Sequence, residues 1–240
     1  MSDIDAQKKA SGDAAAQLVE NGMVVGLGTG STAVWFVRAL AERKLDLTCV
    51  ATSSATQQLG ESLGLKFAEL GETREIDLTV DGADEIGPGL SLIKGGGAAL
   101  LREKLVWEAS ARCIVIADAA KVVKTLGAFA LPIEVVAFGH KTTANRIADV
   151  LTDHDIAMPA RVRTASPQAA SDRVASIGAQ HVRTDGGNLI YDAKCGAIHD
   201  PARLADDLKL ITGVVEHGLF LDLADEAIIG VDGGIEVLTP

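Results

Sequence analysis

Short apolar runs alternate with amphipathic stretches along the first half of the chain. Apolar runs of strand length lie at residues 23–27, 47–51, 66–70, 78–80, 90–93 and 113–117. Between them, residues 4–20, 31–43, 54–63 and 98–110 carry apolar side chains at the spacing of a helix that buries one face. This alternation predicts a mostly parallel sheet with helices on both faces, a doubly wound, Rossmann-like unit.

The order of elements changes after Leu131 and Pro132. The pattern then predicts, in chain order, a strand at 133–137, a helix at 142–152, strands at 160–163 and 188–192, a helix at 202–211 and a strand at 214–220. This is the order of a split, ferredoxin-like α+β domain, and the closing strands, 227–231 and 235–238, are expected in the first sheet. We therefore predict an α/β protein with a Rossmann-like domain, 1–130 and 222–240, and a smaller ferredoxin-like α+β domain, 131–221. Residues 164–187 are expected to form a surface excursion.

Composition excludes several classes of partner. The chain has 240 residues and a net charge of −11, with only 5 Phe, 2 Trp and 1 Tyr. An acidic field repels phosphate backbones and few rings are present to stack on bases, so we expect no nucleic-acid partner. No apolar run reaches the roughly 18 residues of a membrane span, and the first residues do not resemble a signal peptide. We therefore expect a cytoplasmic protein without a membrane partner.

The cysteines and histidines do not suggest a metal site. Cys49 and Cys113 fall in predicted buried strands and Cys195 lies far from both, so all three are expected to be thiols in a reducing compartment. The five histidines are scattered without ligand spacing. The sequence predicts no tightly bound metal.

A glycine-rich turn follows the first predicted strand. Residues 28–33 read GTGSTA, in which two glycines allow close approach to the backbone and hydroxyls open a helix whose free N–H groups attract an anion. The turn therefore favours phosphate. It also fits a dinucleotide fingerprint, but residues 51–54, ATSS, lack the acid that would bind a ribose. A tight turn without a ligand is the alternative.

Other turns at the same predicted sheet edge carry charged residues. Residues 81–85 read DGADE, which by itself suggests a solvated loop or a magnesium site. Residues 94–97 read KGGG, where the entropic cost of three glycines indicates that something approaches the backbone. Glu103 lies in the charge run REK and, from local sequence alone, is expected at the surface; Asp118 and Lys121 follow a further strand. The convergence of these turns predicts a binding site.

Together these motifs resemble a known family. They are GLGTGSTA (26–33), TSS (52–54), DGADEI (81–86), KGGGAALLREK (94–104), ADAAK (117–121), LPIEVV (131–136), DP (200–201), GVVEHGLF (213–220) and IIGVDGG (228–234). The chain resembles ribose-5-phosphate isomerases of the A type over nearly its whole length. Residues 164–183 depart from the family pattern by being longer, and they are expected to lie away from every site motif.

The resemblance implies the reversible isomerisation of ribose 5-phosphate to ribulose 5-phosphate in the non-oxidative pentose phosphate pathway, without cofactor or metal. In family terms Glu103 is the base that moves a proton through an enediolate, and Asp81, Asp84 and Lys94 hold hydroxyls, open the sugar ring and polarise the carbonyl. Either Lys94 or the N–H groups of residues 95–97 could stabilise the enediolate. The substrate-binding residues implied are Thr29, Gly30, Ser31, Thr32, Gly82, Ala83, Gly95, Gly96, Gly97, Lys121 and Lys8.

Two other functions remain alternatives at this point. A nucleotide-dependent oxidoreductase rests on the glycine turn alone. A sugar-phosphate sensor would need the phosphate pocket but no proton-transfer base, so the presence of Glu103 and Lys94 disfavours it. The apolar strands 133–137 and 214–220 suggest a second sheet with an exposed face. We therefore expect a homodimer or homotetramer with the smaller domain at the subunit interface.

Overall fold

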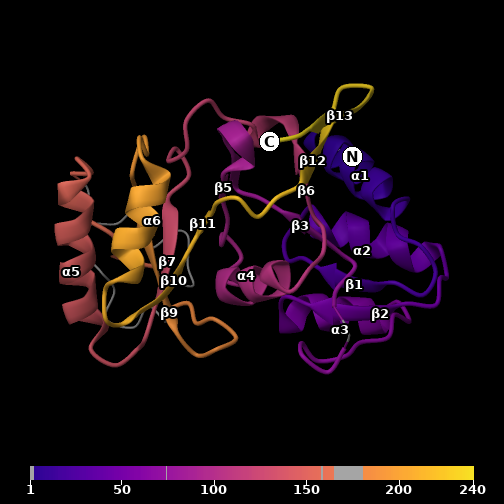
Figure 1. Ribbon diagram of the computed structural model, residues 1–240, viewed down its shortest axis with the longest axis horizontal. Helices are drawn as coiled ribbons and strands as arrows, with labels where there is room; N and C mark the ends of the chain where they lie inside the picture. Colours follow the sequence, from indigo (N-terminus) through magenta and orange to yellow (C-terminus); the bar gives the residue numbers. More distant parts are fainter. Residues whose placement is uncertain (1–2, 74, 158, 165–180) are drawn as a thin grey trace.

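The computed structural model describes residues 3–73, 75–157, 159–164 and 181–240 (Figure 1). The helices are α1 (Asp3–Ala16), α2 (Ala33–Glu42), α3 (Ser54–Ser62), α4 (Leu100–Glu108), α5 (His140–Asp153) and α6 (Pro201–Lys209), with 3₁₀ turns η1 (Pro88–Leu90) and η2 (Ala119–Lys121). The strands are β1 (Val24–Leu27), β2 (Thr48–Ala51), β3 (Leu78–Gly82), β4 (Glu85–Ile86), β5 (Leu92–Ile93), β6 (Cys113–Asp118), β7 (Leu131–Val135), β8 (Arg161–Val162), β9 (Leu189–Ala193), β10 (Val214–His217), β11 (Leu219–Phe220), β12 (Glu226–Val231) and β13 (Gly234–Leu238). No helix among these residues is long and apolar enough to cross a bilayer.

The larger sheet has the order β13-β12-β6-β3-β1-β2. All neighbours pair in parallel except β12 and β13, which confirms the mostly parallel sheet and the return of the last two strands to it. The chain passes from β1 to β2 on one side and then returns to β3 on the other side of β1. This reversal between β1 and β3 is the place where open parallel sheets bind their ligands.

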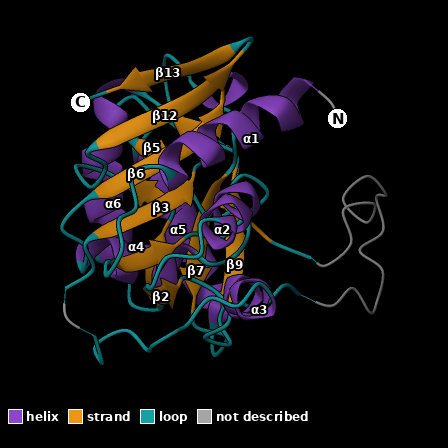
Figure 2. Cartoon of the chain, turned by 90° about the vertical axis from the view of Figure 1, so that its right-hand side faces the viewer, coloured by secondary structure: helices purple, strands orange, loops and turns teal. Residues whose placement is uncertain are grey.

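Helices cover both faces of this sheet because its strands are apolar on both faces. Ile114 and Ile116 of β6 pack with α1 and α2, whereas Val115 of the same strand packs with Trp107 of α4. Figure 2 shows β13, β12, β6 and β3 side by side, with α1 and α2 in front of them. The doubly wound architecture predicted from the sequence is confirmed.

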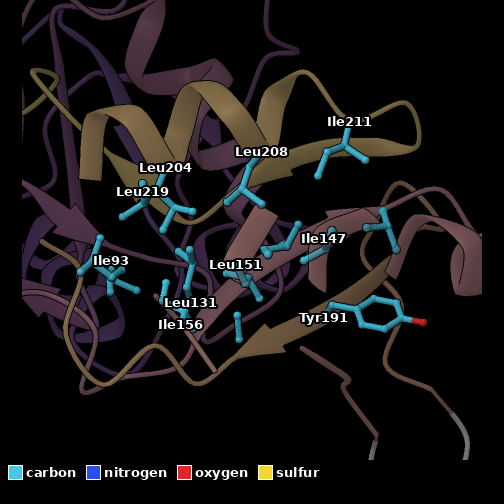
Figure 3. Packing of buried hydrophobic residues seen from close by; sticks show 14 of the residues in the cluster. Ile93, Leu131, Ile147, Leu151, Ile156, Tyr191, Leu204, Leu208, Ile211 and Leu219 are labelled. Atoms are coloured by element: carbon cyan, nitrogen blue, oxygen red, sulfur yellow. The ribbon is translucent and has the colours of Figure 1, made fainter. Parts of the chain in front are cut away.

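The second sheet has the order β10-β7-β9-β8, antiparallel throughout. Its first strand in the chain, β7, lies between the last, β10, and the third, β9, as the ferredoxin-like order requires. Helices α5 and α6 cover one face through Ile147, Leu151, Leu204 and Leu208, which pack on Leu131 and the other inward-facing residues of β7 (Figure 3).

The prediction that the second sheet has an exposed face is wrong. Every residue of β7 is buried, including Glu134 on the side opposite α5 and α6. Helix α4 lies between this side of the sheet and the larger sheet (Figure 1). Lys104 of α4 donates to Glu216 Oε1 of β10 at 2.8 Å. The face is therefore covered within the chain itself.

Some local predictions differ from the structure. Residues 66–70 form only an isolated bridge, Cys49 to Phe67, and residues 92–93 join a separate three-stranded sheet, β11-β5-β4. The predicted strand 214–220 is divided at Gly218, where a Cβ would lie 2.2 Å from the carbonyl oxygen of Lys94. The predicted helix at 54–63 begins at Ser54, and Ser53 caps it by accepting from the Thr56 N–H. Most of the excursion at 164–187, residues 165–180, lies outside the described residues.

Candidate active site

The glycine-rich turn after β1 meets the end of β3 at the reversal of strand order. Asp81 Oδ1 accepts hydrogen bonds from the N–H groups of Thr29 at 3.0 Å and Gly82 at 2.7 Å. A Cβ on Gly28 would lie 2.1 Å from the same oxygen, so only glycine lets the turn come this close to the carboxylate. Position 28 therefore requires glycine because the carboxylate of Asp81 packs against its backbone.

The same turn presents the N-terminus of α2 to solvent. Thr32, the residue before the helix, makes no side-chain cap, and no group in the described part of the chain accepts from the N–H groups of Ser31 or Thr32. Lys8 Nζ donates to Ser31 Oγ at 3.0 Å, and Lys121 lines the same cleft. Free N–H groups, the helix dipole and two ammonium groups form an anion site of phosphate size.

Hydroxyl groups hold Thr29 in place below this anion site. Thr29 Oγ1 lies 2.8 Å from Thr52 Oγ1, 2.7 Å from Ser53 Oγ and 3.1 Å from Thr56 Oγ1. These partners come from the end of β2 and the first turn of α3, where a nucleotide-binding protein would carry an acid for the ribose. The hydroxyl cluster fills that position, and the geometry disfavours the oxidoreductase alternative.

A buried charge cluster lies at the centre of the cleft. Lys94 Nζ is 3.0 Å from Asp81 Oδ2 and 3.4 Å from Glu103 Oε2, and it also donates to the Gly82 carbonyl. The three side chains are at most 3% exposed. The aromatic rings of Trp107 and Phe220 each lie 5.4 Å from Nζ and close the cluster from below. Sequence reasoning placed Glu103 at the surface, and the structure shows that this was wrong.

Burial changes the protonation of this cluster. It raises the pKa of Glu103 to about 8, against the opposing effect of Lys94, and the negative charge of Asp81 adds to the increase. Burial also raises the pKa of Asp81. Burial alone would lower the pKa of Lys94, but the attraction of Asp81 and Glu103 outweighs it and the pKa rises, so the ammonium stays charged. A carboxyl group that titrates near neutral pH is suited to taking a proton and returning it.

Glu103 has one oxygen available for a substrate. Its Oε2 is buried and accepts no hydrogen bond from the described part of the chain. A buried acceptor without a donor is costly, and such atoms occur where function requires them. Glu103 lines the cleft, and the helix that carries it, α4, also packs on the second sheet through Lys104.

The glycine turn after β5 forms the opposite wall of the cleft. The N–H of Gly96 donates to Asp84 Oδ2 at 2.8 Å, and a Cβ on Gly96 would lie 2.7 Å from Asp84 Oδ1. Asp84 therefore packs directly on this backbone. The sequence predicted that the three glycines let another group approach the backbone, and in the structure the side chain of Asp84 does so.

The acids of the turn 81–85 do not converge on one point. Asp81 faces Lys94, Asp84 accepts from Gly96, and Glu85 turns away to accept from the N–H groups of Gly127 at 2.7 Å and Phe129 at 2.5 Å. Among the described residues no group of three acidic, histidine or cysteine side chains is placed to hold a metal. Their directions disfavour the magnesium alternative.

The structure brings the predicted site residues together. All of them except Asp81 line one cleft, and Asp81 lies directly beneath it; the lining residues are Lys8, Thr29, Gly30, Ser31, Thr32, Gly82, Ala83, Asp84, Lys94, Gly95, Gly96, Gly97, Glu103 and Lys121. Sequence reasoning missed Arg163, which donates from the second domain to the carbonyls of Gly95 and Gly96. It also missed Asp185, which bonds to Ser54 and to Arg102 beside Glu103. No local motif marks either residue, since their partners lie far away in the sequence.

Comparison with known proteins identifies close relatives. Residues 48–234 match the family model for ribose 5-phosphate isomerase A (phosphoriboisomerase A). The ribose-5-phosphate isomerase A of Caulobacter sp. strain K31 is 63% identical over 98% of this chain and 99% of its own length. That of Parvibaculum lavamentivorans is 47% identical over 98% of both chains.

Solved structures agree with these matches. A structure of D-ribose-5-phosphate isomerase in complex with phospho-erythronic acid superposes with a TM-score of 0.88, at 34% identity and full coverage of both chains. The structure of ribose 5-phosphate isomerase A from Methanocaldococcus jannaschii superposes with a TM-score of 0.84, at 33% identity over 97% of this chain and 98% of the other. The similarity spans the six-stranded and the four-stranded sheets alike.

Proposed function

The chain belongs to the ribose-5-phosphate isomerase A family, whose members interconvert ribose 5-phosphate and ribulose 5-phosphate, and we propose that Glu103 moves the proton in this reaction. The protein is an isomerase of the pentose phosphate pathway and acts on a small sugar phosphate. The observation that carries the assignment is the buried Oε2 of Glu103, which accepts no hydrogen bond from the described part of the chain and lies 3.4 Å from the ammonium of Lys94.

The proton moves between neighbouring carbons. Glu103 takes the hydrogen from C2 of the open-chain aldose, the C–H electron pair forms a C1=C2 double bond, and the carbonyl electrons move to O1. The same carboxyl group then returns the proton to C1, and the hydroxyl proton of O2 passes to O1 to leave the ketose. One group with a pKa of about 8 serves both directions.

We assign the stabilisation of the enediolate to Lys94. Its Nζ lies so close to Glu103 that O1, on the carbon next to the one being deprotonated, falls within reach of the ammonium. Asp81 and the Gly82 carbonyl hold Nζ in position, so little reorganisation is needed when charge develops. The low-polarity surroundings of Trp107 and Phe220 strengthen the attraction.

Ring opening precedes this step. We propose that Asp84, which faces the cleft, accepts the proton of the O1 hydroxyl while Lys94 donates a proton to the ring oxygen, so that the bond between C1 and the ring oxygen breaks. The proton on Asp84 then returns to Lys94, which is an ammonium again before Glu103 acts. The phosphate would occupy the N-terminus of α2, between Ser31, Thr32, Lys8 and Lys121. The carboxyl groups and the anion site then bind opposite ends of the sugar.

The experiment that tests these roles measures ribulose 5-phosphate formation by purified, EDTA-treated protein. The Glu103→Gln variant is expected to lose about 10²- to 10⁴-fold in kcat while still binding substrate. Glu108→Gln, an exposed residue on the same helix, is the matched control and should be unaffected. Near-normal turnover of Glu103→Gln would remove Glu103 from the mechanism. Binding without turnover in the unmodified protein would favour the sensor alternative.

We also propose a homodimer or homotetramer with the smaller domain at the subunit interface. The support is now the exposure of Phe138 and Leu210 of that domain, 94% and 82%, because the sheet face itself is covered by α4. We also propose the domain boundaries 1–130 with 222–240 and 131–221; the separation of the six-stranded sheet from the four-stranded sheet supports them. A cytoplasmic location is proposed as well, supported by three cysteines that are free and at least half buried.

A further inference from the structure

Arg163 connects the second domain to the glycine turn of the active site. It follows β8, and its backbone N–H donates to the Ile190 carbonyl of β9 at 2.7 Å. Its guanidinium bonds to both carboxylate oxygens of Asp192, also on β9. The remaining nitrogen, Nη1, donates to the carbonyl oxygens of Gly95 at 2.9 Å and Gly96 at 3.0 Å. The guanidinium is therefore held by Asp192 on one side and by the carbonyl groups of the glycine turn on the other.

These bonds determine the direction of the amide groups in the turn. In a trans peptide unit the C=O and N–H point in opposite directions. Since the Gly95 carbonyl points to Arg163, the Gly96 N–H must point away from it, and it does donate to Asp84 on the cleft side. By the same geometry the Gly97 N–H points toward the cleft. No acceptor for it exists in the described part of the chain, although Gly97 lines the cleft.

We propose that Arg163 is a positioning residue. It holds the backbone of residues 95–97 so that the N–H groups of this turn face the substrate, and it thereby fixes the positions of Lys94 and Glu103 relative to each other. Lys94 directly precedes the turn and Glu103 lies on the helix that follows it, so the turn sets the spacing between them. A guanidinium on the carbonyl side also polarises the peptide units and strengthens the N–H donors on the other side. The inference rests on the proposed roles of Lys94 and Glu103.

The clamp acts on the reacting end of the sugar and not on the phosphate site. The anion site at α2 is built from Ser31, Thr32, Lys8 and Lys121, whereas the hydrogen bonds of the Arg163 side chain go to Gly95, Gly96 and Asp192. Loss of the clamp is therefore expected to lower kcat while binding of inorganic phosphate stays the same. A purely structural role for Arg163 would lower the stability of the fold and leave kcat of the folded enzyme unchanged.

The test compares four variants with the unmodified enzyme. Arg163→Ala is expected to lower kcat by about 10- to 100-fold, the effect of displacing catalytic groups by about 1 Å. Arg163→Lys keeps the charge but not the fork, so it should recover only part of kcat. Asp192→Asn, which loosens the clamp without removing it, should have a smaller effect. Arg161→Met, on strand β8 two residues before Arg163 and exposed, is the matched control and should be unaffected.

Chemical rescue separates positioning from general damage. Arg163 is 16% exposed, so millimolar guanidinium should enter the space left in Arg163→Ala and raise kcat, whereas the same concentration of sodium should not. The inhibition constant of inorganic phosphate should change less than twofold in every variant.

Unchanged kcat in Arg163→Ala, or a loss that guanidinium does not reverse, would overturn the proposal. If Arg163→Ala does not fold, Asp192→Asn decides: normal kcat in that variant overturns the proposal. An inactive unmodified enzyme would instead refute the function itself.

Discussion

Replacing Glu103 with glutamine should remove a loss of stability that develops as the pH rises, and should also lower activity. Glu103 is 3% exposed, and burial raises its pKa from 4.5 to about 8. The folded protein therefore retains a proton that the unfolded chain releases as the pH rises above 4.5. Between these two values the unfolded state becomes progressively favoured, so the group contributes stability at low pH that is lost as the pH rises toward 8.

The size of this effect follows from the two pKa values. Linkage predicts that the ionisation of Glu103 lowers the free energy of unfolding by under about 1 kcal/mol at pH 5 and by about 3 kcal/mol at pH 7, relative to its value at acid pH. Glutamine has nearly the same shape and does not titrate. The free energy of unfolding of Glu103→Gln, relative to the unmodified protein, should therefore increase by about 2 kcal/mol from pH 5 to pH 7. Any constant cost of burying the amide cancels in this comparison.

The assay is urea unfolding followed by far-ultraviolet circular dichroism at both pH values, with Glu108→Gln as the control that should show no such trend. Activity is measured on the same samples. If Glu103→Gln becomes less stable relative to the unmodified protein as the pH rises, then Glu103 is ionised in the folded state and its attraction to Lys94 outweighs burial. That result would refute the reasoning on which the base is assigned.

Three further predictions concern the whole enzyme. Because kcat/KM reports ionisation in the free enzyme, it should rise with pH to a plateau with a midpoint near the Glu103 pKa of about 8, and a profile flat from pH 6 to pH 9 would contradict the assignment. Activity should survive prolonged EDTA treatment, because the ammonium of Lys94 occupies the position that a cation would take beside Asp81; loss of activity that magnesium restores would revive the cation site. Light scattering at micromolar concentration should give the mass of a dimer or tetramer, and Phe138→Ser should weaken association; a monomer would reject the proposed interface.

The sequence alone determined the fold class and the edge of the sheet that carries the site. Strand and helix periodicity are local properties, and in a parallel sheet the residues that follow each strand must gather at one edge. The turns at 28–33, 81–85 and 94–97 could therefore be assigned to one cleft before their distances were known. The motifs added the reaction, because their residue types and separation match the isomerase family.

Only the tertiary structure decided which charged groups are buried and what holds them. In local sequence Glu103 belongs to a mixed charge run typical of a surface helix, but in the structure it is buried beside Lys94, which also contacts Asp81. Packing of α4 on the second sheet covers the sheet face that the pattern left exposed. Arg163 reaches Gly95 across 68 positions of sequence, so no periodicity could reveal it. Burial and long-range hydrogen bonds depend on which elements pack together. The raised pKa that makes Glu103 a base depends on this packing too.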